Sequence, residues 1–394
     1  MKPIYSLGYT FSVKSFAFIL NYIVVSSLIL KEYGSFSLIF STLNSIIVVA
    51  SLGLLYSANI FTSKWIGRNN KYIFNYFKFS FYLMTFLSLL SSIAIFYIYG
   101  YFFSVFFAIL IFSASTLLEG FFYGVGEIKR LFIYGALNLA LSLILSFLLV
   151  KNKGLDGAML SLAFSRFLLF IFQLKYFFVK IESDGLFGVR YLKAIILFYK
   201  KYNIPLLISA LIATPVVTLV IYMLSIRKGL EAVAIFSWCY QIYLLGMFVP
   251  TALGTYYLSV LNKKDHSSKL MVMRKITKFN FLISILAILF LLVLSKFVLS
   301  LGNIESFKQS YYVYYAFLIC MLFYSLNLGY LSFWSSVGKN GFYLKLQILW
   351  SLILVIFVFT MVESLGGISI PMGMTLGFLL QYLIQFYKLR EMRG

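Results

Sequence analysis

Residues 279–300 read FNFLISILAILFLLVLSKFVLS, and this stretch decides the class of fold. Its 22 residues include one charged side chain, Lys296. A helix of about 20 apolar residues crosses the hydrocarbon core of a membrane. The stretch lacks the period-two alternation of a barrel strand, and without it only a helix satisfies the backbone polar groups in lipid. It therefore predicts a transmembrane helix.

The rest of the chain has the same character. Of its 394 residues, 62% are apolar and only 11% are charged, whereas about 25% of the residues of a soluble domain are charged. Too little polar surface remains for water to cover the chain. The sequence predicts an all-α polytopic membrane protein with twelve spans, at residues 7–30, 35–60, 79–98, 100–122, 131–150, 158–179, 204–226, 232–260, 279–300, 310–335, 342–362 and 368–387.

The distribution of positive charge predicts the orientation. If the N-terminus is cytoplasmic, 24 of the 33 Lys and Arg residues fall in cytoplasmic connections and 7 fall on the other side. Cytoplasmic loops carry such an excess of Lys and Arg, so we expect both termini in the cytoplasm. The net charge of +22 is thereby explained without a nucleic-acid partner.

Short matches between the two halves indicate an internal repeat. Phe36-Ser37 corresponds to Phe236-Ser237, and GLDGA at 154–158 corresponds to SLGGI at 364–368. Six spans in each half with the same orientation indicate a parallel repeat, as in many transporters. We expect two six-helix lobes separated by a linker, at residues 1–180, 181–203 and 204–394.

The linker has an amphipathic pattern. Leu192, Ile195, Ile196 and Tyr199 recur at helical spacing among Arg and Lys residues. This pattern predicts an interfacial helix that either tethers the two halves at the inner leaflet or binds lipid or a partner.

Several kinds of chemistry find no support in the sequence. The single histidine, His266, lies in a Lys-rich stretch, and Cys239 and Cys320 lie in apolar runs. Catalytic triads, histidine metal clusters and disulfide frameworks are therefore not predicted. We expect no catalytic residues, no metal site and no cofactor, and hence a protein that is not an enzyme.

Two cations, Lys14 and Arg166, lie deep inside predicted spans, where a charge costs about 2.5–3.5 kcal/mol and usually faces a wet cavity or a partner. Arg166 lies deep in its span with Gln173 on the same face, seven residues later. It either attracts an anion in a cavity or pairs with a neighbouring helix. Lys14 shares a face with Thr10 and Asn21, and it either faces a cavity or extends to the headgroups.

Uncharged polar residues and one acid complete the candidate site. Asn44 and Asn138 lie in stripes of small polar residues that either line water or hold helices together. Glu119 is the one acid expected within a span. It is a weak candidate for proton coupling, and a carboxylate hydrated at the membrane end is the alternative.

Three stretches resemble a known family. LKEYGSFSLIFSTLNSIIVVASLGL at 30–54, GLDGAMLSLAFS at 154–165 and GLEAVAIFSWCYQIYLLGMFVPTALGTYYLSVLN at 229–262 are similar to stretches of O-antigen flippases of the Wzx type. These flippases form a branch of the multidrug, oligosaccharidyl-lipid and polysaccharide (MOP) exporter superfamily. The resemblance covers essentially the whole chain as topology.

The resemblance implies a function as well as a fold. Such flippases move an undecaprenyl-diphosphate-linked oligosaccharide, an O-antigen or capsule repeat unit, to the outer leaflet by alternating access. Their cavity cations attract the diphosphate, a role that Arg166 and Lys14 would match here, although two cations are a sparse lining. Expected partners are the lipid-linked substrate, membrane lipids, a polysaccharide polymerase and a chain-length regulator.

Other functions fit the sequence less well. A multidrug or cation antiporter of the same superfamily typically needs cavity acids, and this sequence offers only Glu119. An O-antigen polymerase usually has a large outer loop, and a lipid-dependent glycosyltransferase needs clustered outer acids. The predicted outer connections provide neither feature.

Overall fold

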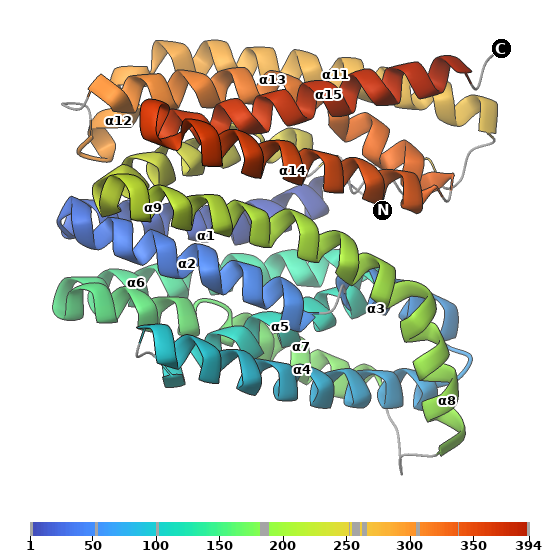
Figure 1. Ribbon diagram of the computed structural model, residues 1–394. Coiled ribbons are helices and arrows are strands. Elements are labelled where there is room, and N and C mark those ends of the chain that lie inside the picture. Colours follow the sequence, from blue (N-terminus) through green and yellow to red (C-terminus); the bar gives the residue numbers. More distant parts are fainter. Residues whose placement is uncertain are drawn as a thin grey trace. The chain divides into compact units, whose positions relative to one another are not determined.

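The computed structural model describes residues 3–51, 54–99, 102–181, 189–251, 253, 261, 266–304, 308–337 and 339–391. These residues are helical almost throughout and include no strand (Figure 1). The prediction of an all-α membrane fold is confirmed. Eight described stretches are long and apolar enough to cross a membrane. Two of them, Ile128–Lys180 and Gly341–Arg390, have 53 and 50 residues, which is enough for two crossings each.

The chain divides into two compact units, Met1–Phe16 with Ile39–Pro215, and Ala17–Leu38 with Val216–Gly394. We call these unit 1 and unit 2. Their boundaries differ from those of the expected lobes at Ala17–Leu38, which belongs to unit 2, and at residues 204–215, which belong to unit 1. The first difference has a packing reason, because Phe18 stacks on Trp238 with ring centroids 5.8 Å apart. The end of the first helix therefore packs with later helices.

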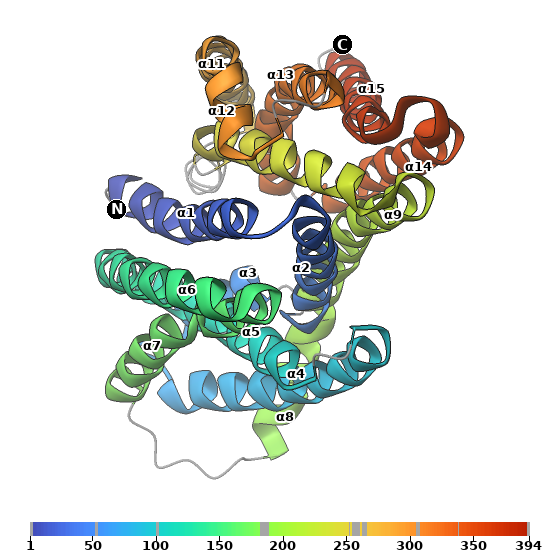
Figure 2. The same ribbon diagram turned by 90° about the vertical axis from the view of Figure 1, so that its left-hand side faces the viewer.

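Unit 1 is built around one central helix. Helix α5 packs against α3, α4, α6 and α7, and Figure 2 shows it among them. Aromatic rings fill the space between these helices, including the fully buried Phe121 and Phe122. The helices of this unit are α3 (Leu54–Trp65), α4 (Asn70–Tyr99), α5 (Phe102–Val125), α6 (Ile128–Phe164), α7 (Phe167–Lys180) and α8 (Val189–Phe198).

Unit 2 has a comparable arrangement. Helix α13 packs against α11 and α15, and α14 packs against α15. These helices run alongside one another in Figure 1. The helices of this unit are α11 (His266–Val293), α12 (Ser295–Leu301), α13 (Lys308–Ser336), α14 (Asn340–Leu365) and α15 (Ser369–Glu391). Three helices have residues in both units: α1 (Pro3–Ser27), α2 (Leu30–Ser51) and α9 (Ile204–Gly246).

Single glycines make the tight turns between consecutive spans. Gly154 interrupts α6 with φ 55° and ψ −128°, and Gly229 interrupts α9 with φ 82°. Gly366, which follows α14, has φ 56° and ψ −132°. Residues with a side chain are strained in this conformation. The nearly identical angles at Gly154 and Gly366 support the internal repeat, with these two glycines as equivalent positions 212 residues apart.

The expected interfacial helix is partly integrated into unit 1. Residues 182–188 of the linker lie outside the described residues, and α8 follows them. Ile195 is fully buried in the aromatic core, and the Tyr199 hydroxyl hydrogen-bonds to Ser80 of α4. Lys193 is exposed. The apolar face of the linker is therefore directed at least in part into the protein.

Candidate functional site

The centre of the candidate site is an ion pair between two helices of unit 1. Arg166, which precedes α7, donates through Nη1 to Oε1 of Glu119 on α5 over 2.8 Å. The two side chains are only 16% and 10% exposed. The guanidinium carbon also lies 4.7 Å from the centre of the Phe112 ring. A buried charge costs several kcal/mol unless it is paired, so each of these two groups requires the other.

The backbone is broken at the arginine. Ser165 and Arg166 form a turn between α6 and α7, with Arg166 at φ −117° and ψ 4°. The Asn138 side chain donates to the Ser165 carbonyl over 2.7 Å and accepts from the Leu169 amide over 3.0 Å. Those two backbone groups would bond to each other in a continuous helix. The Asn138 amide bridges the interruption, and Ser142 adds a 3.1 Å bond to the same carbonyl.

A second polar contact joins the same two helices. Ser115 on α5 donates to Oε1 of Gln173 on α7 over 3.0 Å. The Gln173 side chain is fully buried, and its Nε2 has no hydrogen-bond partner among the described residues. The buried Tyr9 hydroxyl lies within electrostatic reach of Glu119 and Arg166. The site therefore holds a paired cation, a paired acid and an unpaired amide donor.

The other predicted site residues lie elsewhere. Lys14 is exposed on α1 in unit 1, and Asn44 is partly buried on α2 in the same unit. Asn21, predicted to share a face with Lys14, belongs to unit 2. Its side chain donates to the Ala17 carbonyl over 2.8 Å and accepts from the Tyr33 hydroxyl over 3.2 Å. Within unit 1 the structure brings Arg166, Gln173, Asn138 and Glu119 together.

Sequence reasoning did not identify Ser115, Phe112 or Tyr9 as part of this site. A usable signal was present, because Ser115 and Glu119 are four residues apart and share one helix face. Arg166 and Gln173 are separated by seven and share another. Two polar faces, with spacings of four and seven residues, indicate that the two helices which carry them can pair.

Comparison of the sequence with family models and with curated proteins finds no match. Solved structures do match. The chain is similar to an inward-facing multidrug resistance MATE family transporter of the MOP superfamily, with TM-score 0.76, 17% identity, and 100% of this chain and 99% of that one covered. An outward-facing MATE transporter gives TM-score 0.72 and 16% identity over 98% of this chain and 93% of that one.

A third similar structure is a MOP superfamily transporter from Pyrococcus furiosus, described as having a binding pocket of reverse polarity that suggests a different function. Its TM-score is 0.72 at 17% identity, with 99% of this chain and 95% of that one covered. This chain has the fold of MATE-type transporters of the MOP superfamily. At these identities the likeness concerns the fold, so the transported substrate has to be argued from the site.

Proposed function

We propose that this protein is a transporter that moves an undecaprenyl-diphosphate-linked oligosaccharide, an O-antigen or capsule repeat unit, from the inner to the outer leaflet by alternating access. One observation carries the proposal. Among the candidate residues that the sequence places within spans of unit 1, Lys14 and Arg166 are cations and Glu119 is the one acid, which is already bound to the arginine. This balance of charge favours an anionic substrate over a cationic one.

Arg166 has the chemistry to exchange partners. A guanidinium presents five donors in a planar fork, and the hydrogen bond to Glu119 uses one nitrogen, Nη1. Arginine binds carboxylates and phosphates in the same bidentate manner. We propose that the diphosphate competes with Glu119 for Arg166, and that the released carboxylate then takes up a proton. Glu119 would in this way couple substrate binding to protonation.

The proposed orientation follows from the charge bias. Both termini face the cytoplasm of a bacterium, and the protein lies in its inner membrane. Cysteines placed at positions 190 and 266 of a Cys-free variant should react with an impermeant maleimide only in opened cells. Cysteines at positions 153 and 308 should react in intact cells. The polysaccharide polymerase and the chain-length regulator would then act on the product at the outer face.

The transport proposal can be tested with purified protein in vesicles. A fluorescent undecaprenyl-diphosphate oligosaccharide is placed in the membrane, and an impermeant lectin measures how fast its sugar reaches the outside. The wild type should accelerate this transfer, Arg166→Gln should abolish the acceleration, and Arg166→Lys should retain part of it because the charge survives. Lys175→Gln, on the exposed face of α7, is the matched control and should transport normally.

A cation antiporter is the alternative, and the MATE names of the similar structures favour it. The same vesicles loaded with ethidium separate the two functions. Proton-driven ethidium efflux that Glu119→Gln abolishes, with no lectin signal from the lipid-linked sugar, would establish the antiporter and refute the flippase.

A further inference from the structure

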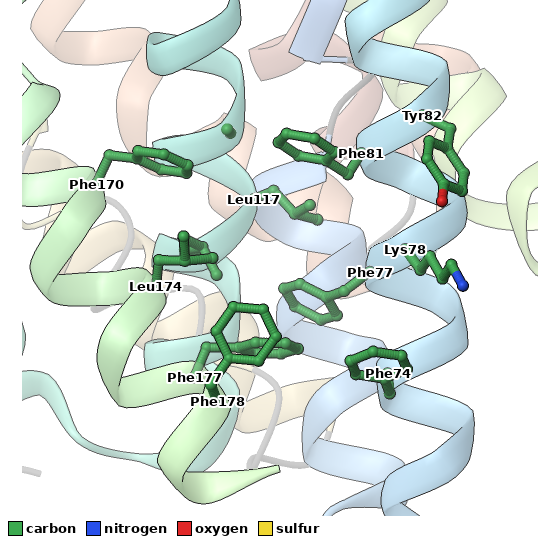
Figure 3. A pocket seen from close by; sticks show the side chains of 12 residues that line it. Phe74, Phe77, Lys78, Phe81, Tyr82, Leu117, Phe170, Leu174, Phe177 and Phe178 are labelled. Carbon is green, nitrogen blue, oxygen red and sulfur yellow. The ribbon is translucent and has the colours of Figure 1, made fainter. Parts of the chain in front are cut away.

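Unit 1 contains an apolar pocket that is separate from the ion pair. Its volume is about 380 Å³, within the range of about 300–1,000 Å³ for small-ligand sites. Figure 3 shows α4 on one side and α7 on the other, with side chains from both directed into the space between them. Phe77, Phe81, Phe170 and Phe177 are among the lining residues, and Leu117 of α5 lies behind them.

One cation lies at the edge of this pocket. Lys78 is the only charged residue that lines it, and in Figure 3 its ammonium extends away from the aromatic rings. Within the described residues no hydrogen bond or ion pair is formed by this ammonium. Tyr82, one turn later, is 61% exposed, and Figure 3 shows its hydroxyl on the same side of α4 as Lys78. The two groups can therefore approach one phosphate from the same side.

The shape and chemistry of the pocket select the ligand class. An apolar lining without further charge suits a hydrocarbon chain, because no polar group is buried by its insertion. A cation and a hydroxyl at the edge suit an anionic headgroup. The charge bias places Lys78 at the cytoplasmic end of its span, where anionic lipids attract basic residues. One molecule with a chain and a phosphate satisfies all three features.

We infer that this pocket binds one anionic glycerophospholipid of the cytoplasmic leaflet, with an acyl chain between α4 and α7 and its phosphate at Lys78 and Tyr82. The site is distinct from the Arg166 site. It therefore does not depend on the transported substrate and would exist in a flippase or an antiporter alike. Its occupant would hold α4 and α7 at a fixed separation.

Native mass spectrometry of the full-length protein in detergent tests the headgroup. Phosphatidylglycerol and phosphatidylcholine with identical acyl chains are titrated, and the affinity of the first bound lipid is compared. The wild type should bind phosphatidylglycerol about fivefold more tightly, the effect of one basic residue at an anionic surface. Lys78→Gln should remove this preference, Lys78→Arg should keep it, and Lys175→Gln should leave it unchanged.

Photolabelling tests the position of the chain. A phosphatidylglycerol with a diazirine at the end of one acyl chain should label peptides that contain Leu117 or Phe170, and Leu174→Trp should suppress this labelling by filling the space. Labelling confined to other helices would overturn the inference. An unchanged lipid preference in Lys78→Gln, or tighter first binding of undecaprenyl phosphate than of phosphatidylglycerol, would do the same.

Discussion

The two units stabilise their interiors by different polar chemistry. Unit 1 buries the charges of Arg166 and Glu119. Unit 2 buries a chain of neutral groups, in which Trp334 donates to Gln385 over 3.1 Å and Gln385 donates to Asn327 over 2.6 Å. Its described ion pair, Arg227 with Glu363, is exposed at 49% and 66%.

This difference distinguishes polar groups that only hold helices together from polar groups that can change partners. A satisfied neutral network holds helices together and does not change between pH 5 and 8. A buried ion pair is weak evidence for stability, because apolar residues of similar volume often pack as well. Its retention in unit 1 is explained if one of its members exchanges partners, as we propose for transport.

The largest effect is expected from breaking the charged pair on one side only. Arg166→Gln leaves Glu119 buried without its partner, which should lower the free energy of unfolding by about 3–5 kcal/mol. Adding Glu119→Gln should restore most of that stability while transport stays absent. Thermal unfolding of the two variants in detergent provides the measurement, and a double variant as unstable as the single one would contradict the pairing.

The next effect is expected from the neutral network of unit 2. Gln385→Leu removes the partner of the Asn327 carbonyl and of the Trp334 indole N–H. Each unsatisfied group costs about 1–3 kcal/mol, and relaxation of the helices recovers part of the cost of two, so we expect a loss of about 2–4 kcal/mol in stability. Transport per folded molecule should be unchanged. A change in the preference for anionic over cationic substrate would show that unit 2 also selects charge.

The equivalent glycines provide a test of the repeat. Gly154→Ala and Gly366→Ala should each cost about 1–3 kcal/mol, because both positions have a positive φ. Gly157→Ala tests close packing and not a positive φ, because an added Cβ there would lie 1.9 Å from the Leu149 carbonyl oxygen. Unfolding midpoints that fall by similar amounts for Gly154→Ala and Gly366→Ala would agree with equivalent turns. A large loss at one position and none at the other would not.

Lys14 is expected to act as a point charge on unit 1. Lys14→Gln should reduce transfer of the lipid-linked sugar about fivefold, and Lys14→Arg should largely preserve it. Transfer rates in the lectin assay decide this. Equal rates for Lys14→Gln and wild type would mean that the lysine only extends to the headgroups.

The smallest effect is expected at the exposed ion pair. Exposed pairs contribute about 0–1 kcal/mol, so Arg227→Gln should hardly change the unfolding temperature. This variant is the control for Arg166→Gln, because both remove an arginine that pairs with a glutamate. A loss as large as that of Arg166→Gln would remove the distinction between the two units.

The sequence predicts the spans well, because in a stretch of about 20 apolar residues only a helix satisfies the backbone hydrogen bonds within lipid. The second half of the span predicted at 232–260 lies largely outside the described residues. Four of the candidate residues, Arg166, Glu119, Asn138 and Gln173, lie together in unit 1, but their contacts were not predicted. Periodicity shows which residues share a helix face, whereas the pairing of Glu119 with Arg166 depends on how α5 and α7 pack.

The break before α7 is a similar case. Asn138 was placed in a polar stripe whose purpose was open. No local rule indicates that its amide replaces a backbone hydrogen bond 27 and 31 residues away. The glycine turns show the converse, because Gly154 lies in the connection predicted between the spans at 131–150 and 158–179. The repeat match of GLDGA with SLGGI aligned Gly154 with Ser364, two residues before the equivalent turn at Gly366.

The order of the paired residues along the chain has a consequence for biosynthesis. A ribosome makes Glu119 47 residues before Arg166, and Asn138 lies between them. The helix with the arginine would therefore be released from the translocon into a bilayer that already contains the carboxylate and the amide that receive it. The tight turn at Gly154 delivers this helix directly beside its predecessor. Because of this order, Arg166 does not enter the bilayer before its partner Glu119 is present. A circular permutant that makes α7 before α5 should insert poorly.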